Sequence, residues 1–224
     1  MKRILLSLFL INLILVSKAQ KAKIEYGFQS GINISTVYGN GVFGDYRSPL
    51  TGFHIGGHLK VSKTENWGLK FIISYDNIGW IYKSLTIENS AGTGVMNADI
   101  SIKLNYLNIP VLAEYSFGKK VKINIDGGGF LGILLNNKIV TDLNPPIPPG
   151  EEASTQTSGD NRKSTNLGLS LGTGIQIPLA SKLKLDFNFR DNLGLTNIIK
   201  SQSADARETK TNSFTISAGL TFKL

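Results

Sequence analysis

The chain has two histidines, and their spacing bears on whether they could share a metal ion. His54 and His58 lie four residues apart in a segment whose apolar and polar residues alternate. In a helix this spacing would bring both rings to one metal ion, but in an extended strand they lie about 13 Å apart on the same face. We therefore expect no metal site, and we interpret both rings as hydrogen-bonding groups on a polar strand face.

Charged residues fall on the polar positions of several alternating segments, and their arrangement admits two readings. Paired carboxylates could act in general acid–base catalysis. If the segments close into a narrow barrel, the same carboxylates would instead face basic side chains across the lumen and form ion pairs. We favour the second reading. It predicts a lumen charge network made of Glu25, Lys70, Glu114, Lys122, Asp126, Lys184, Asp186 and Arg190.

The remaining motifs do not predict catalysis. Gly127–Gly129 is not followed by the helix that a phosphate-binding loop requires, so it marks a bend or a close approach of strands. A serine hydrolase would need Ser, His and an acid or amide converging on the outer surface or rim, and no serine lies in such a context. The chain has no cysteine, which excludes a thiol nucleophile and Cys-based zinc sites. We predict no enzyme and no cofactor, with a membrane-embedded hydrolase as the weakest alternative.

The N-terminus has the layout of a secretory signal peptide. A basic start precedes an apolar run over 4–16, and Ser17 and Ala19 supply the small residues of a cleavage site. The run is too short to cross a bilayer as a helix. We predict a signal peptide over 1–19 and one exported domain over 20–224.

Strict alternation of apolar and polar residues dominates the exported part. Over 213–224, six apolar residues alternate with Ser, Thr, Gly and Lys, so a strand there would have one wholly apolar face. The same period recurs upstream. It predicts eight strands, over about 24–32, 53–60, 67–76, 101–117, 121–126 with a glycine-rich continuation, 166–177, 183–190 and 213–224.

One of these strands contains a slip in its period. Ile102 and Leu104 are apolar at even positions, whereas from Leu107 to Phe117 the apolar residues are at odd positions. A one-residue slip inverts the faces of a strand, so the pattern predicts a β-bulge near Asn105 to Leu107.

Short and long links alternate along the chain. The short ones are 62–66, 118–120 and 180–182, and the long ones are 34–51, 78–100, 137–164 and 197–211. In an up-and-down barrel this puts every long loop on one rim and both termini on the other, as in outer-membrane barrels. Within the longest link, residues 141–163 are rich in Pro, Ser and Thr, and we expect them to be solvated. The fold predicted is a single antiparallel transmembrane β-barrel of about eight strands.

The polar face decides which side of the barrel meets lipid. A soluble lipocalin-type barrel would crowd its exterior with long polar chains, whereas this polar face mixes charges with many glycines. Glycine suits a lumen only wide enough for side chains. Aromatic residues near the predicted strand ends resemble interfacial girdles. These are Trp67, Tyr115, Phe117 and Phe222 on the turn side and Trp80 and Tyr82 on the loop side. We therefore predict that the apolar face points outward into lipid.

Several segments resemble the PorT-type family of outer-membrane β-barrel proteins. They are Gly52–Gly57, Tyr106–Leu112, Gly127–Gly132, Leu193–Ile198 and the closing alternating strand. The most specific pieces are Tyr-Leu-x-Ile-Pro and Gly-Leu-Thr-Asn-Ile. One departure is the last residue, Leu224, because barrel assembly signals often end in an aromatic residue. The resemblance implies an outer-membrane location in a gram-negative cell, and it connects some members with protein secretion.

The sequence leaves two main hypotheses for the function. The first is a non-enzymatic barrel that serves as an anchor and contacts envelope proteins through the four long loops. The second is a narrow porin-like channel or an accessory barrel of a secretion apparatus. A net charge of +8 could suggest nucleic acid as a partner, but the basic residues are scattered and an exported protein rarely meets it. The partners predicted are outer-membrane lipid and other envelope proteins.

Overall fold

Eight antiparallel strands close into a ring, which confirms the predicted fold. The computed structural model describes residues 22–39, 47–88, 95–144, 155–156, 162–200 and 208–224. The strands are β1 Lys23–Tyr38, β2 Arg47–Ser62, β3 Trp67–Glu88, β4 Val95–Phe117, β5 Lys122–Asn144, β6 Thr155–Gln156, β7 Thr165–Ala180, β8 Leu183–Gly194 and β9 Lys210–Lys223. Neighbours in sequence pair around the ring, and β9 pairs with β1 to close it. The two-residue strand β6 lies outside the ring and pairs only with β5.

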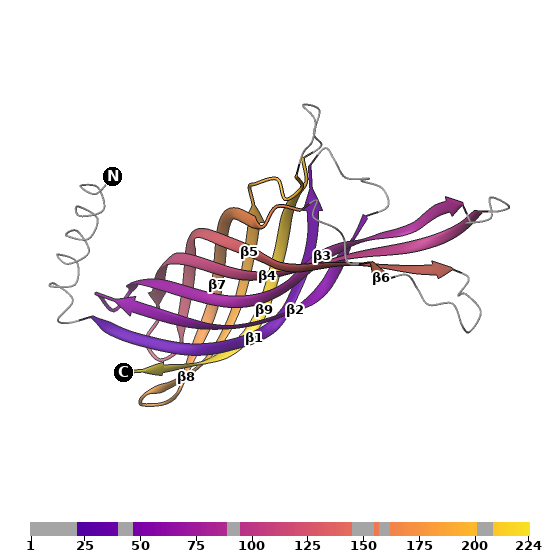
Figure 1. The fold of residues 1–224 in the computed structure, drawn as a ribbon. Helices are drawn as coiled ribbons and strands as arrows, with labels where there is room; N and C mark the ends of the chain where they lie inside the picture. Colours follow the sequence, from indigo (N-terminus) through magenta and orange to yellow (C-terminus); the bar gives the residue numbers. More distant parts are fainter. Residues whose placement is uncertain (1–21, 40–46, 89–94, 145–154, 157–161, 201–207) are drawn as a thin grey trace, which may run out of the picture.

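The turns agree with the predicted topology. Residues 63–66, 118–121 and 181–182 connect consecutive strands at one end of the barrel. The C-terminal end of β9 lies at the same end (Figure 1). The described chain contains no helix long and apolar enough to cross a membrane.

The strands are much longer than the sequence predicted. β3, β4 and β5 contain 22, 23 and 23 residues, so most of 78–100 and the first part of 137–164 are strand rather than loop. Crossing a bilayer takes only about 9–11 tilted residues. These three strands therefore continue well beyond the height of a membrane. They project together with β6 from one side of the barrel (Figure 1). Most of the Pro-rich segment of the longest link lies outside the described residues.

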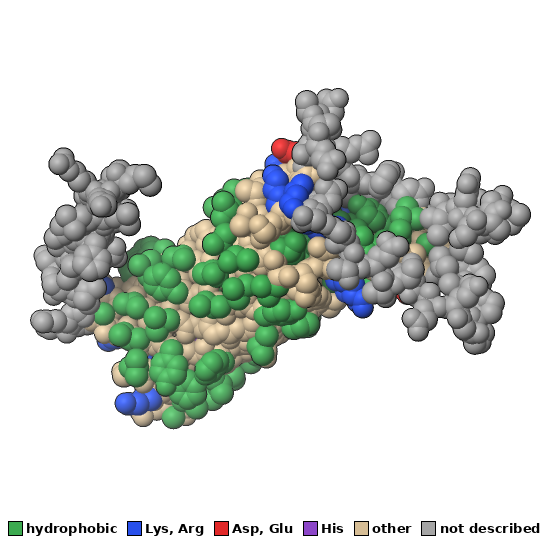
Figure 2. Space-filling view, viewed as in Figure 1, with side chains coloured by type: hydrophobic (Ala, Val, Ile, Leu, Met, Phe, Trp, Pro, Cys, Tyr) green, Lys and Arg blue, Asp and Glu red, His purple; other side chains and the backbone are tan. Residues whose placement is uncertain are grey.

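The outer surface of the barrel carries a broad apolar belt. Phe28, Ile73 and Leu171 point outward and are 67%, 59% and 66% exposed. Figure 2 shows hydrophobic side chains covering the visible wall, with Lys and Arg gathered toward its ends. At the turn end the belt finishes in two aromatic pairs, the tilted pair of Trp67 with Tyr115 and the stacked pair of Tyr26 with Phe222. These contacts agree with the girdle predicted on the turn side.

An asparagine ladder crosses three neighbouring strands at the upper limit of this belt. Asn77 Nδ2 donates to Asn105 Oδ1 at 2.6 Å, and Asn105 Nδ2 donates to Asn136 Oδ1 at 2.5 Å. From Trp67 to Asn77, ten residue steps cover about 33 Å along β3, or about 25 Å of height at a tilt near 40°. That height matches the apolar band of an outer-membrane barrel. We take the ladder as the upper boundary of the belt.

Above the ladder the two faces exchange character. The inward side chains become apolar and pack into a cluster of buried residues: Val37, Ile78, Trp80, Ile102, Leu104, Tyr106 and Ile198. The outward ones become mostly polar, including Lys103, Lys138 and Asp142. Beyond the belt the sheet thus has the polar exterior and apolar interior of a water-soluble barrel, because water has replaced lipid as the outer solvent.

This exchange corrects two predictions. The parity slip in β4 is not a face inversion, because Ile102, Leu104, Tyr106 and Asn108 all point inward in one unbroken register. A bulge does occur at this height, but in β5, where Leu135 is the extra residue between the partners of Asn105 and Tyr106. Trp80 is not an interfacial girdle residue either. It is 2% exposed and lies in the interior cluster, with Tyr82 packed against it.

Candidate functional site in the closed lumen

Inward-pointing glycines leave the room that the charged lumen needs. A Cβ on Gly172 would lie 2.5 Å from Asp126 Oδ1, and one on Gly68 would lie 2.9 Å from Lys60 Cε. Both contacts are shorter than van der Waals distance. The alternation of glycine with charged residues on this face therefore fits long side chains into a narrow barrel. Gly128 has another role, because a Cβ there would meet the carbonyl oxygen of Val111 at 2.1 Å. At that point β5 approaches β4 closely, as the triple glycine predicted.

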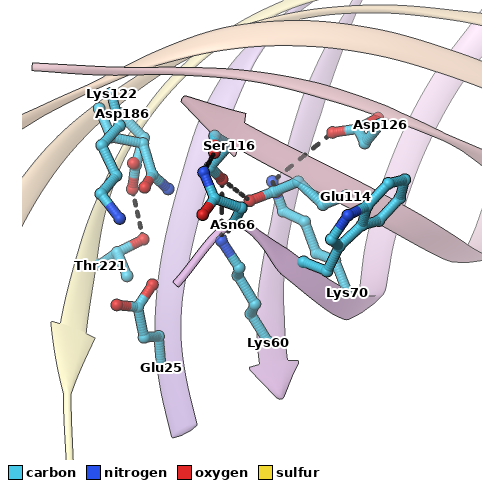
Figure 3. Close-up of polar contacts among 12 residues, drawn as sticks. Glu25, Lys60, Asn66, Lys70, Glu114, Ser116, Lys122, Asp126, Asp186 and Thr221 are labelled. Carbon is cyan, nitrogen blue, oxygen red and sulfur yellow. Dashed lines mark hydrogen bonds and ion pairs between the residues drawn. The ribbon is translucent and has the colours of Figure 1, made fainter. Parts of the chain in front are cut away.

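Glu114 is the centre of the largest ion-pair group. Its side chain is fully buried, and Lys60 Nζ donates a short hydrogen bond to Oε1. Lys70 Nζ lies 3.4 Å from Oε2, and Ser116 Oγ donates to Oε1 at 3.1 Å. Figure 3 shows both lysines reaching Glu114 from neighbouring strands. One carboxylate thus compensates two buried ammonium groups.

Asp126 extends this group across the lumen. Arg190 Nη2 donates to its two carboxylate oxygens at 3.0 and 3.3 Å, from β8 to β5. Lys70 Nζ also lies 3.9 Å from Asp126, so it bridges the two carboxylates. The result is a continuous chain of alternating charges, from Lys60 through Glu114, Lys70 and Asp126 to Arg190.

A second ion pair lies nearer the turn end. Lys184 Nζ donates to both oxygens of Glu25, at 2.7 and 2.8 Å, and to Gln176 Oε1 at 3.3 Å. Both charged side chains are buried. This contact joins β8 to β1 across β9.

Six of the eight predicted network residues make lumen ion pairs, and two do not. Lys122 lies at the rim, where its Nζ donates to the backbone oxygen of Glu65 at 3.2 Å. Asp186 accepts a short hydrogen bond from Thr221 rather than from a basic group. The prediction also missed Lys60, although its place on the same strand face as His58 could have revealed it.

The histidines form separate hydrogen-bonded groups. His54 Nδ1 lies 2.5 Å from Asp76 Oδ1, and its Nε2 lies 2.8 Å from Gln29 Nε2. Donation from Nδ1 to Asp76 with acceptance from Gln29 satisfies both ring nitrogens. His58 Nε2 instead bonds Thr221 Oγ1 at 2.8 Å. Since both histidines of the chain are buried in the lumen, neither lies on the outer surface or rim where a hydrolase would need one. No group of three or more metal-ligating side chains occurs among the described residues.

The loop-side mouth is closed by the segment that follows β8. Leu195 N donates to Leu167 O, Lys163 N donates to Ile198 O, and Ile198 N donates to Thr209 O, all at 2.8 to 2.9 Å. These bonds fold the segment inward, so that Ile198 is fully buried in the apolar cluster. The Gly-Leu-Thr-Asn-Ile motif is therefore a structural cap over the barrel.

Arg162 contacts the aromatic residues of the apolar cluster, and its Nε and Nη1 atoms are buried. Its guanidinium carbon lies 5.2 Å from the centroid of the Trp80 ring, a cation–π contact. Burial lowers the pKa of Arg162, and the neighbouring Tyr106 and Tyr82 partly offset that effect.

Between the cap and the charged groups lies a cavity of about 10 Å³, lined by Asp76, Tyr106 and Asn108 among others. A cavity of this volume is at the lower limit of what holds one water molecule.

These features define a small outer-membrane-type barrel with a filled interior. The chain belongs to the outer membrane protein β-barrel domain family, whose model matches residues 18–200. Membership of this family supports an outer-membrane location. No curated protein matches the chain.

Solved structures with the same fold include a major outer membrane protein from Thermus thermophilus. It is 12% identical, with a TM-score of 0.51 over 92% of this chain and 100% of that one. The Neisserial surface protein A is 17% identical, with a TM-score of 0.42 over 89% of this chain and 97% of that one. OprG from Pseudomonas aeruginosa is 11% identical, with a TM-score of 0.46 over 91% and 95%. At these identities the likeness concerns the fold alone.

Proposed function

We propose that this chain is a non-enzymatic, non-conducting barrel that anchors an interaction surface outside the outer membrane. The observation that carries the proposal is the closure of the lumen at two heights. Ion pairs cross it within the belt, and the apolar cluster with Ile198 fills it above the belt. Each buried charge in the chain from Lys60 to Arg190 has a partner of opposite sign. No free basic ring is left among these residues to serve as a selectivity filter.

The interaction surface would be the part of the sheet above the asparagine ladder, together with the long links. β3, β4 and β5 continue for several residues beyond the barrel wall, and most of their described outward side chains above the ladder are polar, such as Lys103 and Lys138. A stiff sheet of this kind can present loops at a distance from lipid. Its partners would be other envelope or secretion proteins that meet the links within 34–51, 78–100, 137–164 and 197–211.

Planar-bilayer recording of the mature protein tests the closed barrel. We expect no reproducible conductance steps from protein whose heat-modifiable gel mobility confirms a folded barrel. A silent Ile198→Ala variant would agree with closure by the ion pairs alone. Steps from the wild-type barrel would overturn the proposal and favour the narrow channel.

Two finer assignments belong to the same proposal. The Tyr106–Pro110 and Gly194–Ile198 segments support a place in the PorT-type branch of the family, and with it a role beside a secretion apparatus. The alternating strands from residue 22 onward support one barrel domain over 20–224.

The leader over 1–19 has its own test. We propose that it is removed after Ala19 during export. Intact mass spectrometry of protein extracted from outer membranes should give a chain that begins at Gln20. A mass equal to that of the full chain would contradict cleavage.

A further inference from the structure

The turn end of the barrel carries a dense ring of lysines. We call these residues the lysine rim: Lys23, Lys63, Lys119, Lys120, Lys122, Lys182 and Lys223. They come from all three short turns and from the adjoining ends of β1, β5 and β9. Six of the seven are exposed, and Lys122 is half-buried. Figure 2 shows blue Lys and Arg side chains at this end of the barrel, close to the C-terminus marked in Figure 1.

The lysine rim lies directly next to the apolar belt. Lys119 follows Phe117 by two positions, Lys223 follows Phe222, and Lys182 precedes the strand β8. The aromatic pairs at this end, Trp67 with Tyr115 and Tyr26 with Phe222, mark the height of the lipid interface. Lysine side chains one or two residues beyond that interface reach the level of the lipid phosphates.

Acidic side chains do not neutralise the lysine rim. Glu65 is the one exposed acidic side chain in the described turns and adjoining strand ends, and it pairs with Lys23 at 3.2 Å. The lumen carboxylates are already used, since Glu25 pairs with Lys184 and Glu114 with Lys60. Lys63, Lys119, Lys120 and Lys182 have no ion-pair partner within the described chain.

The lysine rim also surrounds an open pocket at the turn end of the barrel. A hollow of about 280 Å³ at this mouth is lined by Lys23, Lys60, Lys122, Lys184 and Lys223 together with Glu25 and Glu65. The lysines around it and around the turns thus produce a positive field over the whole end of the barrel. Such a field attracts anionic phosphate groups and weakens as salt is added.

We propose that the lysine rim binds the phosphate groups of anionic phospholipids in the leaflet that surrounds the turn end. The ring supplies ammonium donors at the height of the headgroups and in every direction around the barrel. Zwitterionic lipids carry their own compensating ammonium group, so lipids with a net negative charge are preferred. The inference rests on the barrel lying in a membrane but not on its being closed.

Two variants of equal charge change provide the test. The rim variant combines Lys63→Gln, Lys119→Gln, Lys120→Gln and Lys182→Gln, which are exposed and outside the lumen network. The control variant combines Lys83→Gln, Lys103→Gln, Lys138→Gln and Lys163→Gln, which are exposed on the loop side. Each full-length mature protein is reconstituted into nanodiscs of phosphatidylethanolamine with a minor fraction of phosphatidylglycerol. Native mass spectrometry then measures the phosphatidylglycerol retained per barrel, after gel mobility has confirmed folding.

We expect the rim variant to retain about tenfold less phosphatidylglycerol than the wild type, because each lysine near a charged surface contributes roughly fivefold and not all four contact one lipid. The control variant should stay close to the wild type. Equal retention by the rim and control variants would overturn the proposal, as would a loss confined to the control. Displacement of the lipid by inorganic phosphate at matched ionic strength would show a site for soluble anions instead. Bilayer conductance, which bears on the closed lumen, would not change this result.

Discussion

Replacing Glu114 by Ala should lower the free energy of unfolding of the barrel by about 3–5 kcal/mol. The variant removes the carboxylate shared by Lys60 and Lys70, both of which lie in the lumen. Lys70 would keep only the longer contact with Asp126, and Lys60 would keep a hydrogen bond to Ser116. An ammonium group left in a narrow interior without its counter-charge is the main source of the expected loss. The urea midpoint of the refolded protein, followed by gel mobility, measures it.

The exposed pair of Lys23 with Glu65 provides a matched control. It too is a Lys–Glu contact, at 3.2 Å, but its side chains are 66% and 81% exposed. Water screens this pair, so Glu65→Ala should change the free energy of unfolding by less than about 1 kcal/mol. If both variants lost the same small amount, the lumen would be hydrated enough to solvate Lys60. That result would contradict the closed, charge-paired interior.

The ring of strands was predictable from the sequence because the same two environments, lipid outside and a polar lumen inside, act on most of each strand. Between the aromatic pairs and the asparagine ladder, lipid lies outside and a polar lumen lies inside. The period of two in 166–177, 183–190 and 213–224 therefore indicates directly both a strand and its outward face. The three short turns agree with the structure for the same reason, since they interrupt that period.

The part of the barrel above the ladder was not predictable in this way, because the meaning of the pattern changes with height. In β4 the residues Ile102 and Leu104 are apolar and inward, whereas below the ladder most inward residues of the barrel are polar, with Leu112 and Pro110 as exceptions in this strand. The sequence shows that the apolar residues of β4 change from odd to even positions, but it does not show that water replaces lipid outside the barrel at that height. A bulge is the natural explanation when one solvent is assumed throughout. The continuation of β3 to β5 past the membrane was missed for the same reason.

For the charge network, the sequence predicted which strand face each residue lies on but not which residue it pairs with. Strand parity placed Glu25, Asp126 and Arg190 on the inward face, as the structure has them. Which charges meet depends on the stagger between strands that are distant in sequence, and no local pattern records that stagger. Hence Lys60 was missed as the partner of Glu114, and Asp186 was expected to pair with a basic group but bonds Thr221.

Replacing Trp80 by Ala should also lower the free energy of unfolding by about 3–5 kcal/mol, because it removes a large side chain from the apolar cluster. Trp80 is 2% exposed and packs with Tyr82 and under Arg162. Trp67→Ala is the control, since Trp67 is 57% exposed on the belt. The Trp67→Ala variant should lower the free energy of unfolding by about 1 kcal/mol, the value of one aromatic pair, because it removes the contact with Tyr115.

Fluorescence separates the two tryptophans more directly than stability does. The chain has only these two, so Trp67→Phe and Trp80→Phe each leave a single reporter. In bilayers with brominated acyl chains, the emission of Trp67 should be strongly quenched because its ring lies in the lipid interface. The emission of Trp80 should be almost unaffected, since its ring lies inside the barrel above the asparagine ladder. Equal quenching of both would return Trp80 to the interfacial girdle that the sequence pattern indicated, and the exchange of faces above the belt would be wrong.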